Sequence, residues 1–373
     1  MSKTRGKYRV GVIGFGSMGR GWSRALTDSA RWELVSICDI SAKARDLAKQ
    51  KYLMAQVTDN PELLLQDSSL DVVGIFTLAD QRPPLIERAL QTGKHLLLEK
   101  PVAADLATED RILALIESSD RQVAVDLFNR NAWYHHEARG FIESGEIGDL
   151  AIVRVRHESP GLLPYARNPS EAVCADGVPF HDCGMHYVDV ARWYAKGEYV
   201  AGKWHAQGQG FWGVPHPWWI EAHGAFSNGV VFSVTQGHNL GHLAKDKASN
   251  CGLEAIGTLG FVRYSHDFKT VNLQCHGITR TVHKEGPYGG KKLDVMVKVF
   301  ADSLDAGRNV GYPTARDAVI ASRVSAEMSE QAYRSLPNKG SLADLQRIFD
   351  HHKELGKEQK YAPGFTLENA AKK

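Results

Sequence analysis

The chain has 373 residues, 43% of them hydrophobic and 24% charged, and its formal net charge is +2 at pH 7. This composition is typical of soluble globular proteins and gives no bias toward nucleic acid or membrane, and no apolar run is long enough to span a bilayer. Five dispersed cysteines without a CxxC pair are typical of reduced thiols, so we expect a cytoplasmic protein. We expect two domains, because single cores seldom exceed about 250–300 residues.

The first predicted element is a buried strand over residues 8–13, which runs directly into the sequence GFGSMG at 14–19. A helix-compatible stretch follows, and then a β-rich apolar run over 33–39 that ends in Asp39. The order of strand, glycines, helix, strand and acidic residue is typical of a dinucleotide-binding unit. The sequence therefore predicts a nucleotide cofactor at the start of the chain.

Each glycine of this loop has an expected role. Gly14 permits the tight turn, Gly16 lets the backbone approach a pyrophosphate, and Gly19 lets the helix pack against the strand. Phosphates are favoured at a helix N-terminus by its unpaired N–H groups and its macrodipole. The residues expected to contact the cofactor here are Gly14, Phe15, Gly16, Ser17, Met18 and Gly19.

The acidic residue after the second strand bears on the choice of cofactor. Asp39 lies 20 residues beyond Gly19, where a carboxylate bonds the ribose 2′-OH of NAD and repels the 2′-phosphate of NADP. Ile40 is the neighbouring expected contact, while Ser41 and Lys43 could partly reverse the preference. We expect NAD, with NADP as the alternative.

Strands and helices continue to alternate as far as Asp126. This alternation implies a parallel sheet with helices on both faces, and we place a Rossmann domain over residues 1–127. The predicted strands are 71–77, 95–98 and 122–126, and the predicted helices are 83–93 and 106–119.

Strand patterns replace the alternation between about residue 150 and residue 276. Residues 226–234 (FSNGVVFSV) predict a hairpin with an Asn-Gly turn. Consecutive strands with short turns imply an antiparallel sheet, packed on helices over 133–144 and 182–195. We therefore expect a second, α+β domain over residues 128–373.

Two further features belong to this second domain. Five of the eight tryptophans fall between residues 193 and 219, and such aromatics fit either carbohydrate contact or a subunit interface. Residues 312–335 predict a helix in which Thr314 is the N-cap and Asp317 lies three residues on. The charged segment 337–373 is predicted to be a surface tail.

The sequence PFHDCGMHYVD at 179–189 gathers several polar side chains. On a helix Asp182 and His186 share one face, with Asp189 roughly one turn further on. A metal site needs three or four convergent ligands, and this set supplies fewer. The pattern favours proton transfer over ordinary polar core residues, and no metal is expected.

Glu99-Lys100-Pro101 directly follows the predicted strand at 95–98. With this tripeptide in place, the chain resembles the Gfo/Idh/MocA oxidoreductase family (glucose-fructose oxidoreductase, inositol dehydrogenase). The resemblance implies an NAD(P)-binding domain, followed by a second domain whose large open, mainly antiparallel sheet supplies substrate and subunit contacts. The segments that carry it are GFGSMG, IFTLADQRPPLIERALQTGKHLLLEKP, FIESGEIGDL, GVPFHDCGMHYVDV and YPTARDAVIASRVS.

By this resemblance Lys100 is the active-site lysine, and Asp182 and His186 match the family's Asp-x-x-x-His pair. Oxidation of an alcohol needs a hydride acceptor and a base, and histidine suits the base because its ordinary pKa is about 6.5. Lys100 would bond the reacting oxygen, and Asp182 would orient His186 or bond a substrate hydroxyl. Thr77 would contact the nicotinamide ribose. Glu99 is expected near the cofactor, paired locally or catalytic.

Residues 128–131 (FNRN) resemble the family segment that enters the substrate cleft. Asn129 and Arg130 are therefore expected substrate contacts, with a salt bridge as the alternative for Arg130. The loop TLADQR departs from the family pattern at Leu78 and Arg82.

The resemblance implies an NAD(P)-dependent dehydrogenase or reductase acting on a polyol, sugar or sugar derivative, assembled as a homodimer or homotetramer through the C-terminal sheet. The alternative within the family is an NAD-dependent glycoside-cleaving enzyme that oxidises, eliminates and re-reduces. A third, non-enzymatic interpretation is a nucleotide sensor or scaffold, which the retained lysine, aspartate and histidine argue against.

Overall fold

The computed structural model describes residues 7–159, 180–209, 217–238, 240 and 248–336, so the predicted tail over 337–373 lies outside the described residues. The chain divides into two compact units. The first comprises residues 1–131 and 291–322, and the second comprises residues 132–290 and 323–373. No helix among the described residues is both long enough and apolar enough to cross a bilayer.

The first unit is built on a sheet of six parallel strands in the order β3-β2-β1-β4-β5-β6. This is the strand order of the dinucleotide-binding doubly wound fold, and it confirms the predicted fold class. Strand 95–98 was predicted to the residue. The strands are β1 (Tyr8–Ile13), β2 (Trp32–Cys38), β3 (Gln56–Thr58), β4 (Val72–Ile75), β5 (His95–Leu98) and β6 (Val123–Val125).

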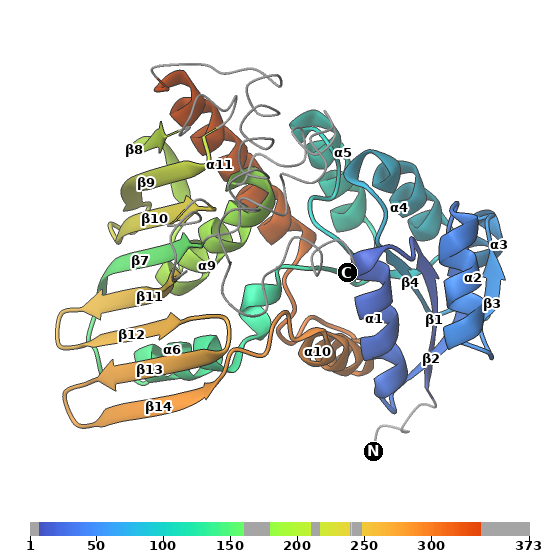
Figure 1. Ribbon diagram of the computed structural model, residues 1–373, viewed down its shortest axis with the longest axis horizontal. Coiled ribbons are helices and arrows are strands. Elements are labelled where there is room, and N and C mark those ends of the chain that lie inside the picture. The colour runs from blue at the N-terminus through green and yellow to red at the C-terminus, as the bar shows by residue number, and fades with distance from the viewer. Residues whose placement is uncertain (1–6, 160–179, 210–216, 239, 241–247, 337–373) are drawn as a thin grey trace, which may run out of the picture. The chain divides into compact units, whose positions relative to one another are not determined.

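Helices cover both faces of this sheet. The β1-α1-β2 and β4-α4-β5 connections run in opposite directions across the sheet, so right-handed crossovers place α1 and α4 on opposite faces. Figure 1 shows α1 beside α10, and α4 beside α5. The helices are α1 (Ser17–Asp28), α2 (Ala42–Lys51), α3 (Glu62–Leu65), α4 (Arg82–Gln91), α5 (Leu106–Ser118) and α10 (Leu293–Ala306), with short 3₁₀ turns η1 (Ala79–Gln81) and η2 (Phe128–Asn131).

The first unit takes in a late segment of the chain, because α10 completes its core. The rings of Trp32 and Phe300 stack with centroids 6.2 Å apart, and the Trp32 indole N–H donates to the carbonyl oxygen of Val297 at 3.1 Å. Both aromatic side chains are fully or almost fully buried. The sequence placed everything after residue 127 in the second domain, whereas residues 291–322 pack with the first unit.

The second unit is built on an eight-stranded sheet in the order β14-β13-β12-β11-β7-β10-β9-β8. All neighbours are antiparallel except β7 and β10, which are parallel. The predicted hairpin is confirmed: β9 and β10 are joined by a turn in which Gly229 has a φ of 85°. The strands are β7 (Leu150–Glu158), β8 (Tyr199–Gln209), β9 (Trp219–Phe226), β10 (Val231–Gly237), β11 (Asn250–Gly257), β12 (Phe261–His266), β13 (Thr270–His276) and β14 (Thr281–Pro287).

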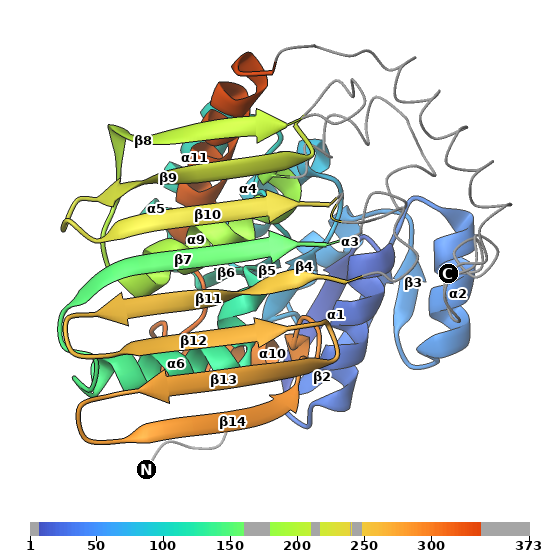
Figure 2. The ribbon, with the colours of Figure 1, turned by 60° about the vertical axis from the view of Figure 1, so that its left-hand side comes forward.

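Helices cover one face of the eight-stranded sheet, as Figure 2 shows from the uncovered side. They are α6 (Trp133–Glu143), a π-helical turn η3 (Phe180–Gly184) that leads into α9 (Met185–Ala195), and the later part of α11 (Ala315–Arg334). The predicted N-cap of α11 is confirmed, since the Thr314 hydroxyl bonds the Asp317 carboxylate at 2.8 Å and accepts the Asp317 N–H at 3.2 Å. The opposite sheet face carries exposed and half-buried side chains on its central strands, among them Ile152, Arg154 and Val231.

We expect Phe300→Ala to lower the free energy of unfolding of the first unit by about 3–5 kcal/mol, because it empties a fully buried ring site. Urea unfolding followed by the fluorescence of Trp22 and Trp32, both in this core, measures the change. Val310→Ala is the matched control, since Val310 is 43% exposed. Equal midpoints for the two variants would contradict the assignment of α10 to this core.

Candidate active site

The glycine loop after β1 has three different steric environments. Gly14 has a φ of 89°, and a Cβ there would lie 2.8 Å from the carbonyl carbon of Phe76. A Cβ on Gly19 would lie 1.8 Å from the carbonyl oxygen of Gly14, whereas one on Gly16 would have no atom within 4 Å. Gly14 and Gly19 are thus required by the fold, and the space at Gly16 is open to a ligand.

Helix α1 begins immediately after this open space. Gly16 is its N-cap residue, no side chain caps its first turn, and no acidic residue lies in that turn. The first N–H groups of a helix have no partner within the helix, so they can bind an anion. The loop therefore suits a phosphate group.

The Asp39 carboxylate is fixed by main-chain groups on both sides. One oxygen accepts the N–H of Phe15 at 2.6 Å, and the other accepts the N–H of Ser41 at 2.7 Å. Arg45 donates to the carbonyl oxygens of Asp39 and Ile40 at 2.9 and 3.0 Å. Each carboxylate oxygen can accept a further hydrogen bond, so Asp39 can hold the glycine loop and still bind a hydroxyl. The Ile40 side chain is 91% exposed.

A buried arginine joins the loops that follow β4 and β5. Arg82 is 6% exposed, and its guanidinium donates to the carbonyl oxygen of Thr77 at 2.6 Å and to that of Pro101. Arg82, where the chain departs from the family pattern, therefore ties the Thr77 loop to the Glu99-Lys100-Pro101 segment. Leu78, the other departure, is 65% exposed.

Two carboxyl groups lie buried where β5 and β6 end. Glu99 is 4% exposed and accepts the indole N–H of Trp22 at 3.4 Å, while Asp126 is 1% exposed. From sequence, Asp126 is predicted only as the end of a strand. The available signal was an acidic residue closing the apolar run VAVD, next to the predicted strand that carries Glu99.

Residues 128–131 form the 3₁₀ turn η2. Arg130 forms an ion pair with Asp317 at 3.2 Å, and the two side chains are only 10% and 16% exposed. This is the salt bridge that the sequence left open for Arg130. Asn129 is 5% exposed. Substrate contacts by Asn129 and Arg130 stay predictions.

His186 lies in the first turn of α9 in the second unit and is 3% exposed. Asp182 belongs to the π-helical turn before it, and the Asp182 side chain lies outside the described residues. A π-helix bonds i to i+5, so the i,i+4 geometry predicted for Asp182 and His186 does not carry over directly. Among the described residues, no three or more His, Cys, Asp and Glu side chains converge as for a metal ion.

Tyr187, the residue after His186, belongs to a cluster of polar side chains that the sequence did not predict. The Tyr187 hydroxyl lies 2.5 Å from Nδ1 of His157, and the Cys251 sulfur lies 3.6 Å from the same nitrogen. Burial holds the pKa of His157 well below 6.5 and raises the pKa of Cys251 to about 12, so both groups are neutral at pH 7. His238 and His266 lie at the same end of the sheet. The available signal was a histidine at the end of three strand-like runs, VRVRH (153–157), VTQGH (234–238) and VRYSH (262–266).

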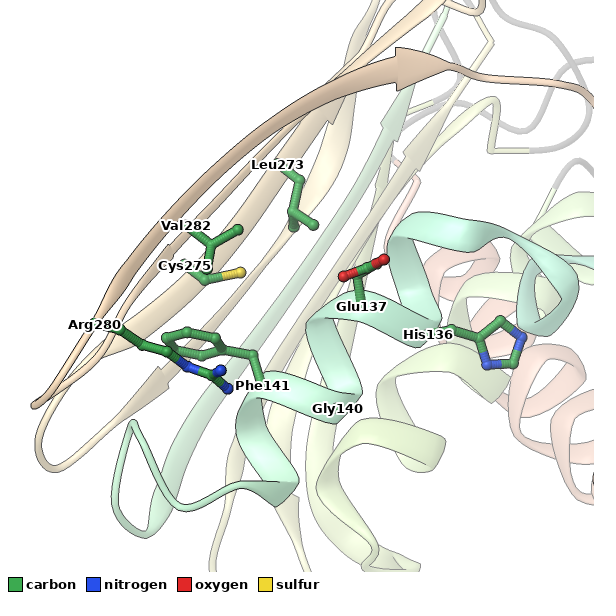
Figure 3. Close-up of a pocket in the computed structure, with 8 residues that line it drawn as sticks. All are labelled: His136, Glu137, Gly140, Phe141, Leu273, Cys275, Arg280 and Val282. Atoms are coloured by element: carbon green, nitrogen blue, oxygen red, sulfur yellow. The ribbon is translucent and has the colours of Figure 1, made fainter.

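The second unit also contains a cavity of about 350 Å³ between α6 and the β13–β14 hairpin. Figure 3 shows Phe141 of α6 beside Arg280, which lies over the ring at 5.1 Å from its centroid. Glu137 pairs with Lys284 at 2.6 Å, so its charge is already compensated. None of the predicted site residues lines this cavity, and we assign it no role.

Comparison with known proteins identifies relatives of both parts of the chain. Residues 8–127 match the family described as "Oxidoreductase family, NAD-binding Rossmann fold" (Gfo/Idh/MocA). Residues 135–263 match the C-terminal domain of the same family. Together the two matches cover most of the chain.

Curated relatives include inositol 2-dehydrogenase of Salmonella typhimurium, 26% identical over 194 residues (51% of this chain and 55% of the relative). Inositol 2-dehydrogenase/D-chiro-inositol 3-dehydrogenase of Lacticaseibacillus casei is 29% identical over 196 residues (52% and 54%). These matches thus span about half the length of the curated relatives.

Among solved structures, myo-inositol 2-dehydrogenase of Lactobacillus plantarum superposes with a TM-score of 0.73 at 20% identity, covering 88% of this chain and 98% of that one. Scyllo-inositol dehydrogenase of Lactobacillus casei, with bound NAD(H) and scyllo-inositol, superposes with a TM-score of 0.69 at 19% identity (88% and 97%).

The two glycines at either side of the α1 N-terminus should respond differently to substitution. Gly19→Ala should destabilise the protein by about 1–3 kcal/mol, because the new methyl group overlaps a carbonyl oxygen. Gly16→Ser should leave thermal stability within about 0.5 kcal/mol, since the site is open and serine is a good N-cap residue. The same serine side chain should weaken NAD binding, if the open space receives the pyrophosphate. Thermal unfolding and cofactor titration measure both effects, and a destabilised Gly16→Ser protein would contradict the assignment.

Proposed function

Because this chain belongs to the Gfo/Idh/MocA oxidoreductase family, we propose that it is an NAD(P)-dependent dehydrogenase or reductase. It transfers a hydride between the nicotinamide and a secondary alcohol or ketone of a polyol, sugar or sugar derivative. The observation that carries the proposal is the open space at Gly16, at the uncapped start of α1 and at the switch point of the parallel sheet. The names of the curated relatives favour inositols within this substrate class.

The residues around the glycine loop fit a dinucleotide. The N–H groups at the start of α1 bind the pyrophosphate, and Asp39 bonds the ribose hydroxyls. The position of Asp39 favours NAD over NADP, because its charge would repel a 2′-phosphate. Further cofactor contacts in this proposal are Ile40, Thr77 and Glu99.

The reacting groups are Lys100 in the first unit and Asp182 and His186 in the second. A bound nicotinamide supplies the hydride acceptor or donor. His186 takes the proton from the hydroxyl in oxidation and returns it in reduction. Lys100 bonds the reacting oxygen and stabilises negative charge on it. Asp182 orients His186 or bonds a neighbouring substrate hydroxyl. The buried histidine and tyrosine groups at His157 and Tyr187 support the segment that carries His186.

The cysteines bear on where the protein acts. Cys38, Cys183, Cys251 and Cys275 are free thiols. Burial raises the pKa of Cys38 to about 11 and that of Cys251 to about 12, which leaves both in the unreactive thiol form. Free thiols are usual in reducing compartments, and we place the enzyme in the cytoplasm.

The direct test of this function is an absorbance assay for NADH formation from NAD⁺ across inositols, aldoses and glycosides, with NADP⁺ in parallel. Reduction of cofactor with a polyol supports the dehydrogenase. Release of an aglycone without net cofactor reduction would replace it with the glycoside-cleaving alternative. No reaction with any compound of the panel would contradict both.

We expect His186→Ala to lower kcat by about 10²–10⁴-fold, the usual contribution of a general base. The affinity for NAD should stay unchanged, because His186 is assigned to the proton and not to the cofactor. Steady-state kinetics and cofactor titration measure the two quantities. His136→Ala is the control, since this histidine on α6 is exposed. Full turnover in the His186 variant would refute the acid–base assignment.

The uncovered face of the eight-stranded sheet fits a subunit interface. An apolar row crosses four neighbouring strands, because Val231 pairs with Ile152, Ile152 with Ile256, and Ile256 with Phe261. Val231 is 47% exposed, and an apolar row on an uncovered sheet face is typical of a protein-binding surface. We propose that the enzyme is a homodimer or homotetramer assembled through this face.

Replacing Val231 and Phe261 together by lysine should dissociate the oligomer, because charges would then enter the centre of the apolar row. Light scattering coupled to gel filtration gives the mass directly, and we expect that of a monomer. Leu63→Lys serves as the control, because Leu63 lies on α3 in the first unit and is 62% exposed. An unchanged oligomeric mass in the double variant would exclude this face.

A further inference from the structure

Two buried carboxyl groups lie side by side just after the ends of two neighbouring strands. Leu98 of β5 and Val125 of β6 are partners in the parallel ladder, so the next residues, Glu99 and Asp126, emerge together at the carboxyl edge of the sheet. The N–H of Asp126 donates to the carbonyl oxygen of Leu98 at 2.9 Å, which fixes this arrangement. The two carboxyl-bearing residues are 4% and 1% exposed, so water provides little solvation for either.

The hydrogen-bond partners of the two carboxyl groups differ. The indole N–H of Trp22 donates to Glu99 at 3.4 Å. Within the described part of the chain, no hydrogen-bond partner reaches either carboxyl oxygen of Asp126. A buried carboxylate without a hydrogen-bond donor is costly to ionise, so these surroundings favour a proton on Asp126.

The charges around the pair also favour a bound proton on Asp126. Burial, and then the negative charge of Glu99, raise the pKa of Asp126 well above 3.8. Lys291, just before α10, and Lys100 act in the opposite direction but do not cancel the rise. Trp22 is the contact from α1, and it carries no charge. At neutral pH the pair therefore holds one proton and one negative charge.

We propose that Glu99 and Asp126 are a positioning pair for Lys100, sharing one proton so that a single negative charge stands beside its ammonium group. This inference rests on the proposed function, in which Lys100 bonds the reacting oxygen. One negative charge stabilises the ammonium form, which is the form that donates to a carbonyl or alkoxide oxygen. A second charge would hold the ammonium group against the carboxylates, and no charge would favour the neutral amine.

The charge state of Lys100 can be followed without any substrate. In the full-length protein, reductive methylation with ¹³C-formaldehyde labels the lysines for NMR titration, and Lys100→Arg identifies the Lys100 signal. Asp126→Asn removes the protonated group and leaves the Glu99 carboxylate, so this variant should keep the wild-type titration midpoint of Lys100. The double variant Asp126→Asn/Glu99→Gln removes the charge, and its Lys100 signal should titrate at lower pH.

The Asp126→Asn variant distinguishes a pair that holds one proton from two ionised carboxylates. If both groups were ionised, this substitution would remove one charge and move the Lys100 midpoint to lower pH, which would overturn the proposal. Asp120→Asn is the matched control, since Asp120 is an exposed carboxylate just before β6 and should not affect Lys100.

Protein stability provides a second, independent measurement. It needs only the wild type and Asp126→Asn, so it remains available if the double variant does not fold. Asp126 keeps its proton in the folded protein, whereas in the unfolded chain it loses it near its ordinary value of about 4. From about pH 4 upward, the unfolding constant of the wild type should therefore rise relative to that of Asp126→Asn, by about tenfold per pH unit until the raised pKa is reached. Urea unfolding of the first unit between about pH 5 and about pH 7 measures this ratio, and a ratio independent of pH would overturn the shared proton.

Failure of this inference and failure of the proposed function are distinguishable. Neither the Lys100 titration nor the unfolding ratio uses cofactor turnover. If the protein passes both tests but reduces no cofactor with any polyol, the inferred pair stands and the proposed reaction is refuted. If the protein reduces cofactor but Asp126→Asn shifts the Lys100 midpoint, the proposed reaction stands and the inferred pair is refuted.

Discussion

The six parallel strands of the first unit end at one edge of their sheet, and the proposed cofactor contacts of that unit follow the ends of four of them. Gly14 follows β1, Asp39 follows β2, Thr77 lies just beyond β4, and Glu99 follows β5. Parallel pairing places the carboxyl ends of the strands at the same edge, so strand pairing alone brings together residues that are far apart in sequence. The glycine loop can then lie against this edge because Gly14 and Gly19 have no side chains to collide with it.

Hydrogen-bonded polar groups hold this edge together. Asp39 accepts main-chain N–H groups from the glycine loop and from the segment after β2, and Arg82 joins the loops after β4 and β5. Such groups are costly to bury unless they are bonded, so each one commits two loops to a single arrangement. The loops that would contact a cofactor are therefore fixed relative to one another before any ligand binds, which lowers the entropy cost of binding.

The sequence predicted most elements of both sheets, because alternating apolar runs and glycine-proline signals mark them strongly. It omitted β3, β11 and β14. Strand β3 is only three residues long, β11 contains glycines, and β14 (TVHKEGP) is largely exposed and lacks an apolar face. The place of α10 in the first unit was missed, since membership of a core depends on long-range packing of side chains such as Phe300. The glycine loop and Glu99-Lys100-Pro101 were found from local motifs. Asp126 and Arg82 were not recognised as site residues, because only strand register and loop contacts give them partners. The predicted catalytic residues Lys100, Asp182 and His186 stay proposals.

The measurement that most directly tests this account is a crystal structure of the full-length protein with NAD⁺. The account predicts the pyrophosphate on the N–H groups at Gly16 and Ser17, the adenosine ribose on the carboxylate of Asp39, and the nicotinamide beside Thr77 and Lys100. A dinucleotide bound elsewhere, or a Gly16 site that stays without ligand in a protein shown to bind NAD⁺ in solution, would contradict it.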